Sequence, residues 1–150
     1  MRKSPSRIFT FIIIGLYVSL FVTTSTSLYS IASTLVGSLT SIEEIDYTSS
    51  EDEMTGIVDL TMNIPAKNPG VLDVKVKIGF KMFSIDETVV AEGSDTKNIA
   101  PGNTAQFVIS TSFLRDDVEN VEISVECRSF FDMFGLSLST KLEEYPTSEE

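Results

Sequence analysis

The sequence contains no histidine and no tryptophan, and its 150 residues include a single cysteine, Cys127. Histidine is the side chain that most often serves as a general base or a metal ligand, so chemistry that depends on it is excluded. One cysteine can form neither an internal disulfide nor a cysteine-based zinc cage. Cys127 lies on the apolar side of an alternating run, which predicts a small buried side chain rather than a reactive thiol.

Basic residues are also scarce, with 11 lysines and arginines against 22 aspartates and glutamates and a net charge of −11. All of the acidic residues lie in 43–150, and a surface this acidic repels nucleic acid, so we expect no nucleic-acid partner. The carboxylate clusters are interpreted as solvated charge. The best candidate for weak cation binding is the loop with Asp116, Asp117 and Glu119. We predict no catalytic residue, metal site or cofactor, and we expect that the protein is not an enzyme.

Charged and amide side chains are missing altogether from residues 8–42. This stretch begins densely apolar, as IFTFIIIGLYVSLFV, and continues rich in serine and threonine. A helix of this length would measure about 52 Å, which exceeds the roughly 30 Å hydrocarbon core of a bilayer. We therefore predict a transmembrane helix and a helical extension over 8–40, with the span near 8–28. The hydroxyls are tolerated because they bond to carbonyls of the preceding turn.

Charge sets the expected orientation of this helix. The basic N-terminus, residues 1–7, should be cytoplasmic, and the acidic remainder should be extracytoplasmic. A cleaved signal peptide is the rival interpretation, with a small-x-small site at Ser25-Thr26-Ser27. We favour an uncleaved anchor, because the uncharged stretch continues well past that site. One helix face carries apolar residues, and a second carries a small-residue stripe that would permit helix-mediated oligomers. These faces consist of Leu28, Ile31, Leu35 and Leu39, and of Ser33, Gly37 and Ser41, respectively.

After an acidic segment over 41–54, interpreted as a linker or a weak first strand, apolar residues alternate with polar ones. The clearest run is LDVKVKIGFKM, which places Val74, Val76, Ile78 and Phe80 on one face and lysines on the other. Short alternating strands separated by turn signals predict an all-β fold over 55–144. We expect an immunoglobulin/fibronectin-like antiparallel β-sandwich preceded by one N-terminal transmembrane helix, with a disordered tail over 145–150.

The segment IPAKNPG (64–70) is predicted to define the fold between the two best strands. Asn68 precedes a proline and so favours an extended backbone. Pro69 and Gly70 at the two central positions favour a type II turn, in which Gly70 takes a positive φ. Pro65 lacks an N–H and is expected to mark the place where its strand leaves the ladder.

Aromatic residues gather in SFFDMFG (129–135). Neighbouring residues of a regular strand point to opposite faces, so at least one of these phenylalanines could be exposed. Phe130, Phe131 and Phe134 are therefore candidates for a partner contact or a lipid contact. The alternative is a bulge that turns both Phe130 and Phe131 inward.

Three segments in order carry a family resemblance: VDLTMNIPAKNPGVLDVKVKIGFKMF (58–83), VVAEG (89–93) and IAPGNTAQFVIS (99–110). Together they resemble the group 2 late embryogenesis abundant proteins, the water-stress and hypersensitive-response domain, over roughly residues 45–144. The resemblance implies a small, membrane-anchored, fibronectin-like sandwich with no catalytic residues, acting in stress or desiccation protection or in envelope maintenance. The alternative is an accessory interaction subunit of a membrane or cell-surface complex, in which the sandwich binds a protein partner.

Overall fold

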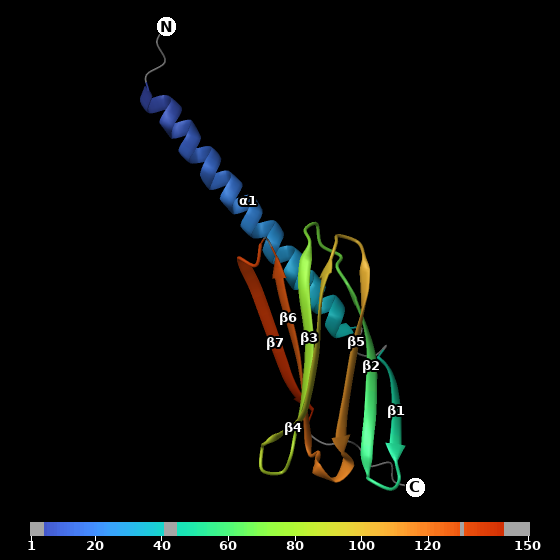
Figure 1. Ribbon diagram of the computed structural model, residues 1–150. Helices are drawn as coiled ribbons and strands as arrows, with labels where there is room; N and C mark the ends of the chain where they lie inside the picture. Colours follow the sequence, from blue (N-terminus) through green and yellow to red (C-terminus); the bar gives the residue numbers. More distant parts are fainter. Residues whose placement is uncertain (1–4, 41–44, 130, 143–150) are drawn as a thin grey trace.

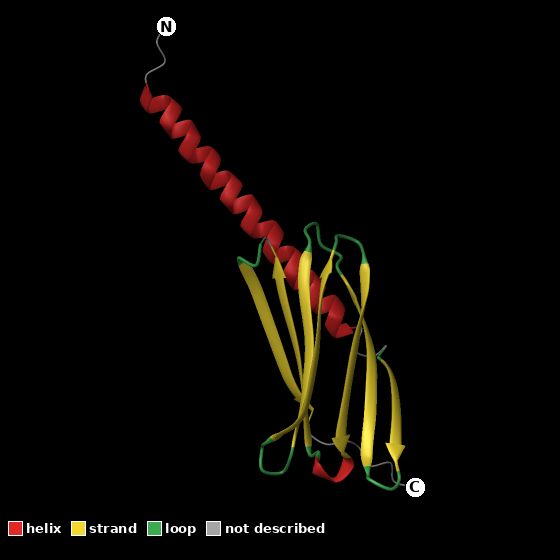
Figure 2. Ribbon diagram, viewed as in Figure 1, coloured by secondary structure: helices red, strands yellow, loops and turns green. Residues whose placement is uncertain are grey.

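A long helix leads into two antiparallel sheets in the computed structural model, which describes residues 5–40, 45–129 and 131–142 (Figures 1 and 2). The predicted cytoplasmic segment 1–7 lies largely outside this part of the chain, as does the predicted tail over 145–150. The elements are α1 (Pro5–Thr40), β1 (Asp46–Asp52), β2 (Ile57–Lys67), β3 (Val74–Phe83), β4 (Val89–Ile99), β5 (Thr104–Leu114), η2 (Arg115–Asp117), β6 (Asn120–Ser129) and β7 (Phe134–Leu142).

The strands form one sheet in the order β1-β2-β5 and a second in the order β4-β3-β6-β7, and every neighbouring pair is antiparallel. The chain crosses from one sheet to the other three times, between β2 and β3, between β4 and β5, and between β5 and β6. This arrangement confirms the predicted antiparallel sandwich, with strands alternating between an inner and an outer face.

The core follows the predicted alternation most closely in β3. Val74, Val76, Ile78 and Phe80 are buried, whereas the lysines between them are exposed. From the opposite sheet, β2 and β5 contribute further buried residues, and Cys127 on β6 is fully buried as predicted. Each inner face is apolar because every second residue of a strand points into the space between the sheets.

In the first sheet one open alternative is decided and one prediction is wrong. Residues Asp46–Asp52 form the edge strand β1, which selects the weak first strand over the linker for this part of 41–54, although each of its side chains is exposed. The wrong prediction concerns Pro65. Pro65 does not end its strand, because β2 continues to Lys67 with Pro65 opposite Gln106. The pairing with β1 reaches only Asn63, so among the described strands nothing pairs with β2 on that side at Pro65, where a missing N–H breaks no ladder bond.

Helix α1 has two parts that meet different surroundings. From Thr10 to Val22 its side chains are exposed, and the stretch Thr10–Ser38 is long and apolar enough to cross a membrane. From Ser27 onward one side of the helix is buried against β6, β2, β7 and β3, so it contacts strands of both sheets (Figure 1). The predicted bonds between hydroxyls and preceding carbonyls are present, for example from Ser38 Oγ to the backbone carbonyl oxygen of Thr34 at 2.8 Å.

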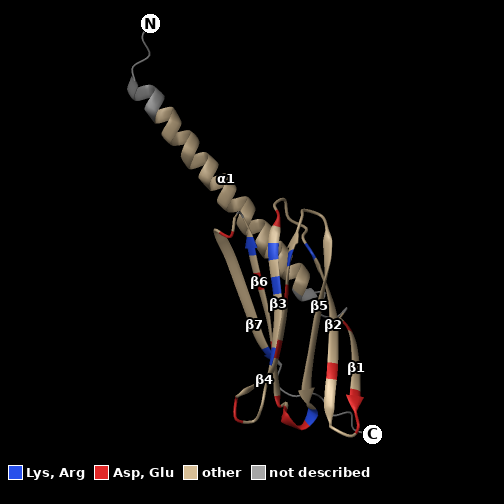
Figure 3. Cartoon of the chain, viewed as in Figure 1, with Lys and Arg blue, Asp and Glu red and all other residues tan. Residues whose placement is uncertain are grey.

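Charge is distributed unevenly along the strands (Figure 3). Among the described residues, the half of the sandwich nearest the exposed part of α1 carries five basic and five acidic residues. The opposite half carries three basic and eleven acidic residues. The net negative charge of the described sandwich therefore lies at the end farthest from the apolar helix.

Candidate functional site

The most densely bonded polar group of the described chain is the side chain of Asn68, at the end of β2. Asn68 is fully buried, and its Nδ2 donates to the carbonyl oxygens of Leu72 and Ile99, each at 2.8 Å. Its Oδ1 accepts the Gly70 N–H at 2.9 Å and the Thr34 hydroxyl of α1 at 3.1 Å. One amide thus joins the helix, the loop before β3 and the end of β4.

The same loop touches α1 one turn earlier, at Ser30. The Oγ of Ser30 accepts the backbone N–H groups of Val71 and Leu72, at 3.0 and 3.2 Å. A Cβ placed on Gly70 would lie 2.6 Å from both Cα and Cβ of Ser30, so only glycine permits this approach. Gly70 is not among the residues with positive φ, so the predicted type II turn is wrong and close packing is what requires the glycine.

We call the contact between α1 and the loop at residues 68–72 the joint. The helix face in this joint consists mainly of small hydroxyl residues rather than of leucines. Ile31 is buried and Leu35 partly buried, as the predicted apolar face requires, but Leu28 is exposed and the side chain of Leu39 lies outside the described residues. The buried polar members of the face are Ser27, Ser30, Thr34 and Ser38. Small side chains allow the helix axis to approach the sheets closely, as they do between membrane helices.

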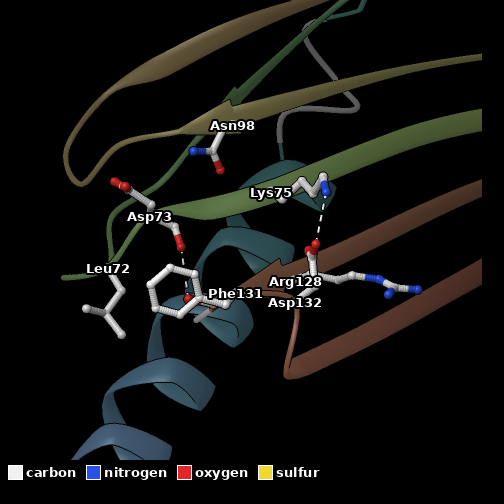
Figure 4. Close-up of a pocket in the computed structure, with 8 residues that line it drawn as sticks. Leu72, Asp73, Lys75, Asn98, Arg128, Phe131 and Asp132 are labelled. Carbon is white, nitrogen blue, oxygen red and sulfur yellow. Dashed lines mark hydrogen bonds and ion pairs between the residues drawn. The ribbon is translucent and has the colours of Figure 1, made fainter.

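A shallow depression of about 470 Å³ opens beside the joint, between the start of β3 and the end of β6 (Figure 4). Phe131 and Leu72 lie on one side of it, and the ion pair between Lys75 and Asp132 (3.1 Å) lies on the other. Its polar groups are largely engaged with one another, since Ser129 Oγ also donates to the backbone carbonyl oxygen of Asp73 at 2.9 Å. No group of three or more Asp, Glu or Cys residues within the described ranges is placed to hold a metal ion.

The three candidate phenylalanines have different surroundings. Phe134 is partly buried and packs against the core, whereas Phe131 is 91% exposed in the loop between β6 and β7. Phe130 lies outside the described residues. Of the small-residue stripe, Ser33 and Gly37 are partly buried and Ser41 is not described. The joint itself escaped prediction, because the hydroxyl-rich half of α1 looked like an extension of a membrane span.

Cys127 should be nearly inert towards thiol reagents while the protein is folded. Burial, with a smaller contribution from the charge of Glu126, raises the pKa of the Cys127 thiol to about 12. Since the thiolate is the nucleophile, this raised pKa and the burial of the sulfur should slow the reaction at pH 8 by more than about tenfold relative to the unfolded chain, although a thiolate of higher pKa is intrinsically more nucleophilic. A disulfide reagent added with and without denaturant measures this ratio. Equal rates would contradict it.

Comparison with known proteins adds little beyond the fold. No known family model matches the sequence, and no curated protein is significantly similar to it. A glycoside hydrolase family 2 β-glucuronidase is 12% identical over 66% of this chain, with a TM-score of 0.44. A β-glucuronidase from Bacteroides uniformis is 11% identical over 66%, with a TM-score of 0.47. A FixG-related protein from Vibrio parahaemolyticus is 12% identical over 67% of this chain and 94% of its own, with a TM-score of 0.39.

This chain spans only 11% and 13% of the lengths of the two hydrolases. At these identities and TM-scores, the hydrolase activities named for those proteins carry no argument about this chain.

Proposed function

We propose that the protein is a non-catalytic, single-pass membrane protein whose sandwich stands outside the cytoplasm and protects or maintains the envelope. The observation that carries this proposal is the continuity of α1, whose apolar half leads without a break into the half that packs on the sandwich. A domain attached in this way keeps a fixed position relative to its anchor. The concentration of acidic residues at the end remote from α1 supports a domain that faces water there.

The stress-protective role extends the resemblance to group 2 late embryogenesis abundant proteins. The segments that carry the resemblance form β2, the loop at Asn68, β3, part of β4 and β5. Asn68, which lies in the first of these segments, has a side chain that bonds α1, the loop before β3 and the end of β4. Within the described residues, this supports a fold-defining role for the motif rather than a catalytic one.

Orientation is tested by cysteine labelling in a background that lacks Cys127. The exposed position Ser49 on β1 and the position Ser6 before the span provide matched single-cysteine variants, S49C and S6C. A membrane-impermeant maleimide should label S49C in intact cells and S6C only after permeabilisation. Labelling of S6C alone in intact cells would reverse the proposed orientation.

Protection is tested on phosphatidylcholine vesicles that carry the full chain and a trapped fluorescent dye. After drying and rehydration, vesicles with the full chain should retain more dye than vesicles with a peptide of residues 1–40, which supplies the helix without the sandwich. Equal leakage from the two preparations would contradict a protective role for the sandwich.

The accessory-subunit function remains a second candidate, favoured by the exposed Phe131 and Met133 at one end of the domain. It predicts a partner that stays at fixed stoichiometry through gentle detergent extraction and cross-linking of the native membrane. Recovery of the protein alone would reject this second function.

A further inference from the structure

The loops nearest the exposed half of α1 lie level with the helix turn at Ser30. Two backbone N–H groups of the loop before β3, those of Val71 and Leu72, bond to Ser30 Oγ. Leu72 and Phe131 line the same depression, which places the loop between β6 and β7 at this end as well (Figures 1 and 4). From Thr10 to Ser30 the helix rises about 30 Å, which matches the hydrocarbon core of a bilayer.

This end of the sandwich presents apolar tips instead of the polar loops that normally face water. Phe131 is 91% exposed, Met133 70% and Val71 58%. Tyr29 on α1 is 59% exposed at the same level, where aromatic side chains favour a membrane–water interface. The exposed apolar groups therefore surround the point at which the helix leaves the sandwich.

Phe131 also has a strained backbone. Its φ is +53° and that of Asp132 is +62°, in the left-handed region that glycine, asparagine and aspartate favour and bulky residues avoid. The phenylalanine side chain at this left-handed position is almost entirely exposed to solvent. Two successive positive φ values are usual in the tight turn of a β-hairpin, here between β6 and β7, but that turn favours glycine, asparagine or aspartate over an exposed phenylalanine.

The charges at this end do not oppose contact with lipid headgroups. Basic and acidic residues are equal in number in this half of the sandwich, and several are paired. The pairs are Lys75 with Asp132, Lys97 with Asp95 and Arg128 with Glu126. Although burial tends to raise the pKa of Asp95, hydrogen bonds from Val108 N–H and Lys97 lower it below its usual value, so this carboxylate is charged at neutral pH.

We propose that Val71, Phe131 and Met133, together with Tyr29, enter the headgroup region of the bilayer that α1 crosses. The sandwich then rests end-on against the membrane, with its acidic end directed away from it. This inference rests on the proposed membrane span of α1 and adds a second lipid contact to it. The surface that these side chains contact is the bilayer itself, because the span brings the lipid surface to the level of these loops.

Because the chain has no tryptophan, single-tryptophan variants report one site each. We compare F131W at the proposed contact with Y17W in the apolar half of α1 and I85W in the turn between β3 and β4 at the opposite end. All three side chains are exposed in the described structure. Each full-length variant is reconstituted in phosphatidylcholine vesicles, with or without lipid brominated near the headgroup end of the acyl chain, which quenches tryptophan on contact.

We expect F131W to lose emission to a degree comparable with Y17W, while I85W keeps its emission. Quenching of Y17W without quenching of F131W would overturn the inference and leave the anchor intact. Absence of quenching in both would reject the anchor itself. A blue shift of F131W that depends on protein density and occurs without quenching would show that this end binds protein, and it would also overturn the inference.

A second variant separates lipid contact from folding. F131N replaces the phenylalanine by a residue that tolerates the left-handed backbone, so the melting temperature in detergent should stay equal or rise. In vesicles, a tryptophan placed at the neighbouring tip, M133W, should be less quenched when F131N is also present. Unchanged quenching would contradict a joint insertion of the two side chains.

Discussion

Replacing Gly70 with alanine should destabilise the folded protein by about 3 kcal/mol, the upper part of the usual range for overpacking a tight contact. The added methyl group would lie 2.6 Å from the Cα and Cβ of Ser30, and a backbone atom of a helix cannot move aside as a flexible side chain can. Either α1 or the loop must shift, which also weakens the bonds from Val71 and Leu72 to Ser30. Thermal unfolding in detergent, followed by far-ultraviolet circular dichroism, should show a midpoint roughly 10 to 20 °C lower.

The matched control for this variant is G37A, on the helix side of the same joint. A Cβ on Gly37 would meet only the Lys67 carbonyl oxygen at 3.5 Å, an ordinary van der Waals contact. Because alanine favours a helix over glycine by about 1 kcal/mol, G37A should be neutral or stabilising. Equal losses in G70A and G37A would show that the close approach at Ser30 is not what requires Gly70.

The sandwich could be predicted from the sequence because its strands have one solvent-exposed face and one buried face. In β3, lysines alternate with Val74, Val76 and Ile78, so the period of two specifies both the strand and its inner side. β1 was harder to predict, because each of its side chains is exposed and an edge strand needs no apolar pattern. Its pairing depends on the exposed backbone of β2, which side-chain periodicity does not encode.

The joint between α1 and the sandwich could not be predicted for a different reason. Its contacts join residues more than thirty positions apart, such as Thr34 with Asn68 and Ser30 with Leu72. Serine and threonine in an uncharged helix are as compatible with a membrane span as with a helix packed on a domain, since their hydroxyls bond to their own helix in both settings. A buried face made of hydroxyl groups is recognised only when its partners, here backbone N–H groups and an amide, are already in place.

Ser27 shows that not every buried hydroxyl of this face is equally important. Its Oγ is buried and has no hydrogen-bond partner within the part of the chain that the structure describes, in contrast to those of Ser30 and Thr34. A buried polar atom without a partner costs free energy, whereas a partnered one contributes about 1 kcal/mol. The joint is therefore held mainly by the turn around Ser30 and Thr34, next to the loop that Asn68 organises.

Replacing Asn68 with leucine should cost about 4 kcal/mol or more of folding free energy, because three buried partners and one part-buried partner lose their bonds while the number and branching of side-chain heavy atoms stay the same. The Leu72 and Ile99 carbonyls would lose a donor, and the Gly70 N–H and Thr34 hydroxyl would lose an acceptor. The midpoint of thermal unfolding should fall further than in any other single variant of this joint. Hydrogen exchange at Gly70 should accelerate as well, since its amide is held by Asn68 Oδ1.

Two controls separate this network from simpler effects of the N68L substitution. N98L makes the same change at an exposed asparagine of β4, one residue before Ile99, and should alter stability by no more than about 0.5 kcal/mol. T34V removes only the bond from the helix to Asn68 Oδ1, which still accepts the Gly70 N–H, so it should cost about 1 kcal/mol. If N68L were no more damaging than T34V, the loop would hold its shape without the amide. The sandwich and its anchor would then be joined by the contact of Gly70 with Ser30, and Asn68 would not be the residue that fixes the domain on its helix.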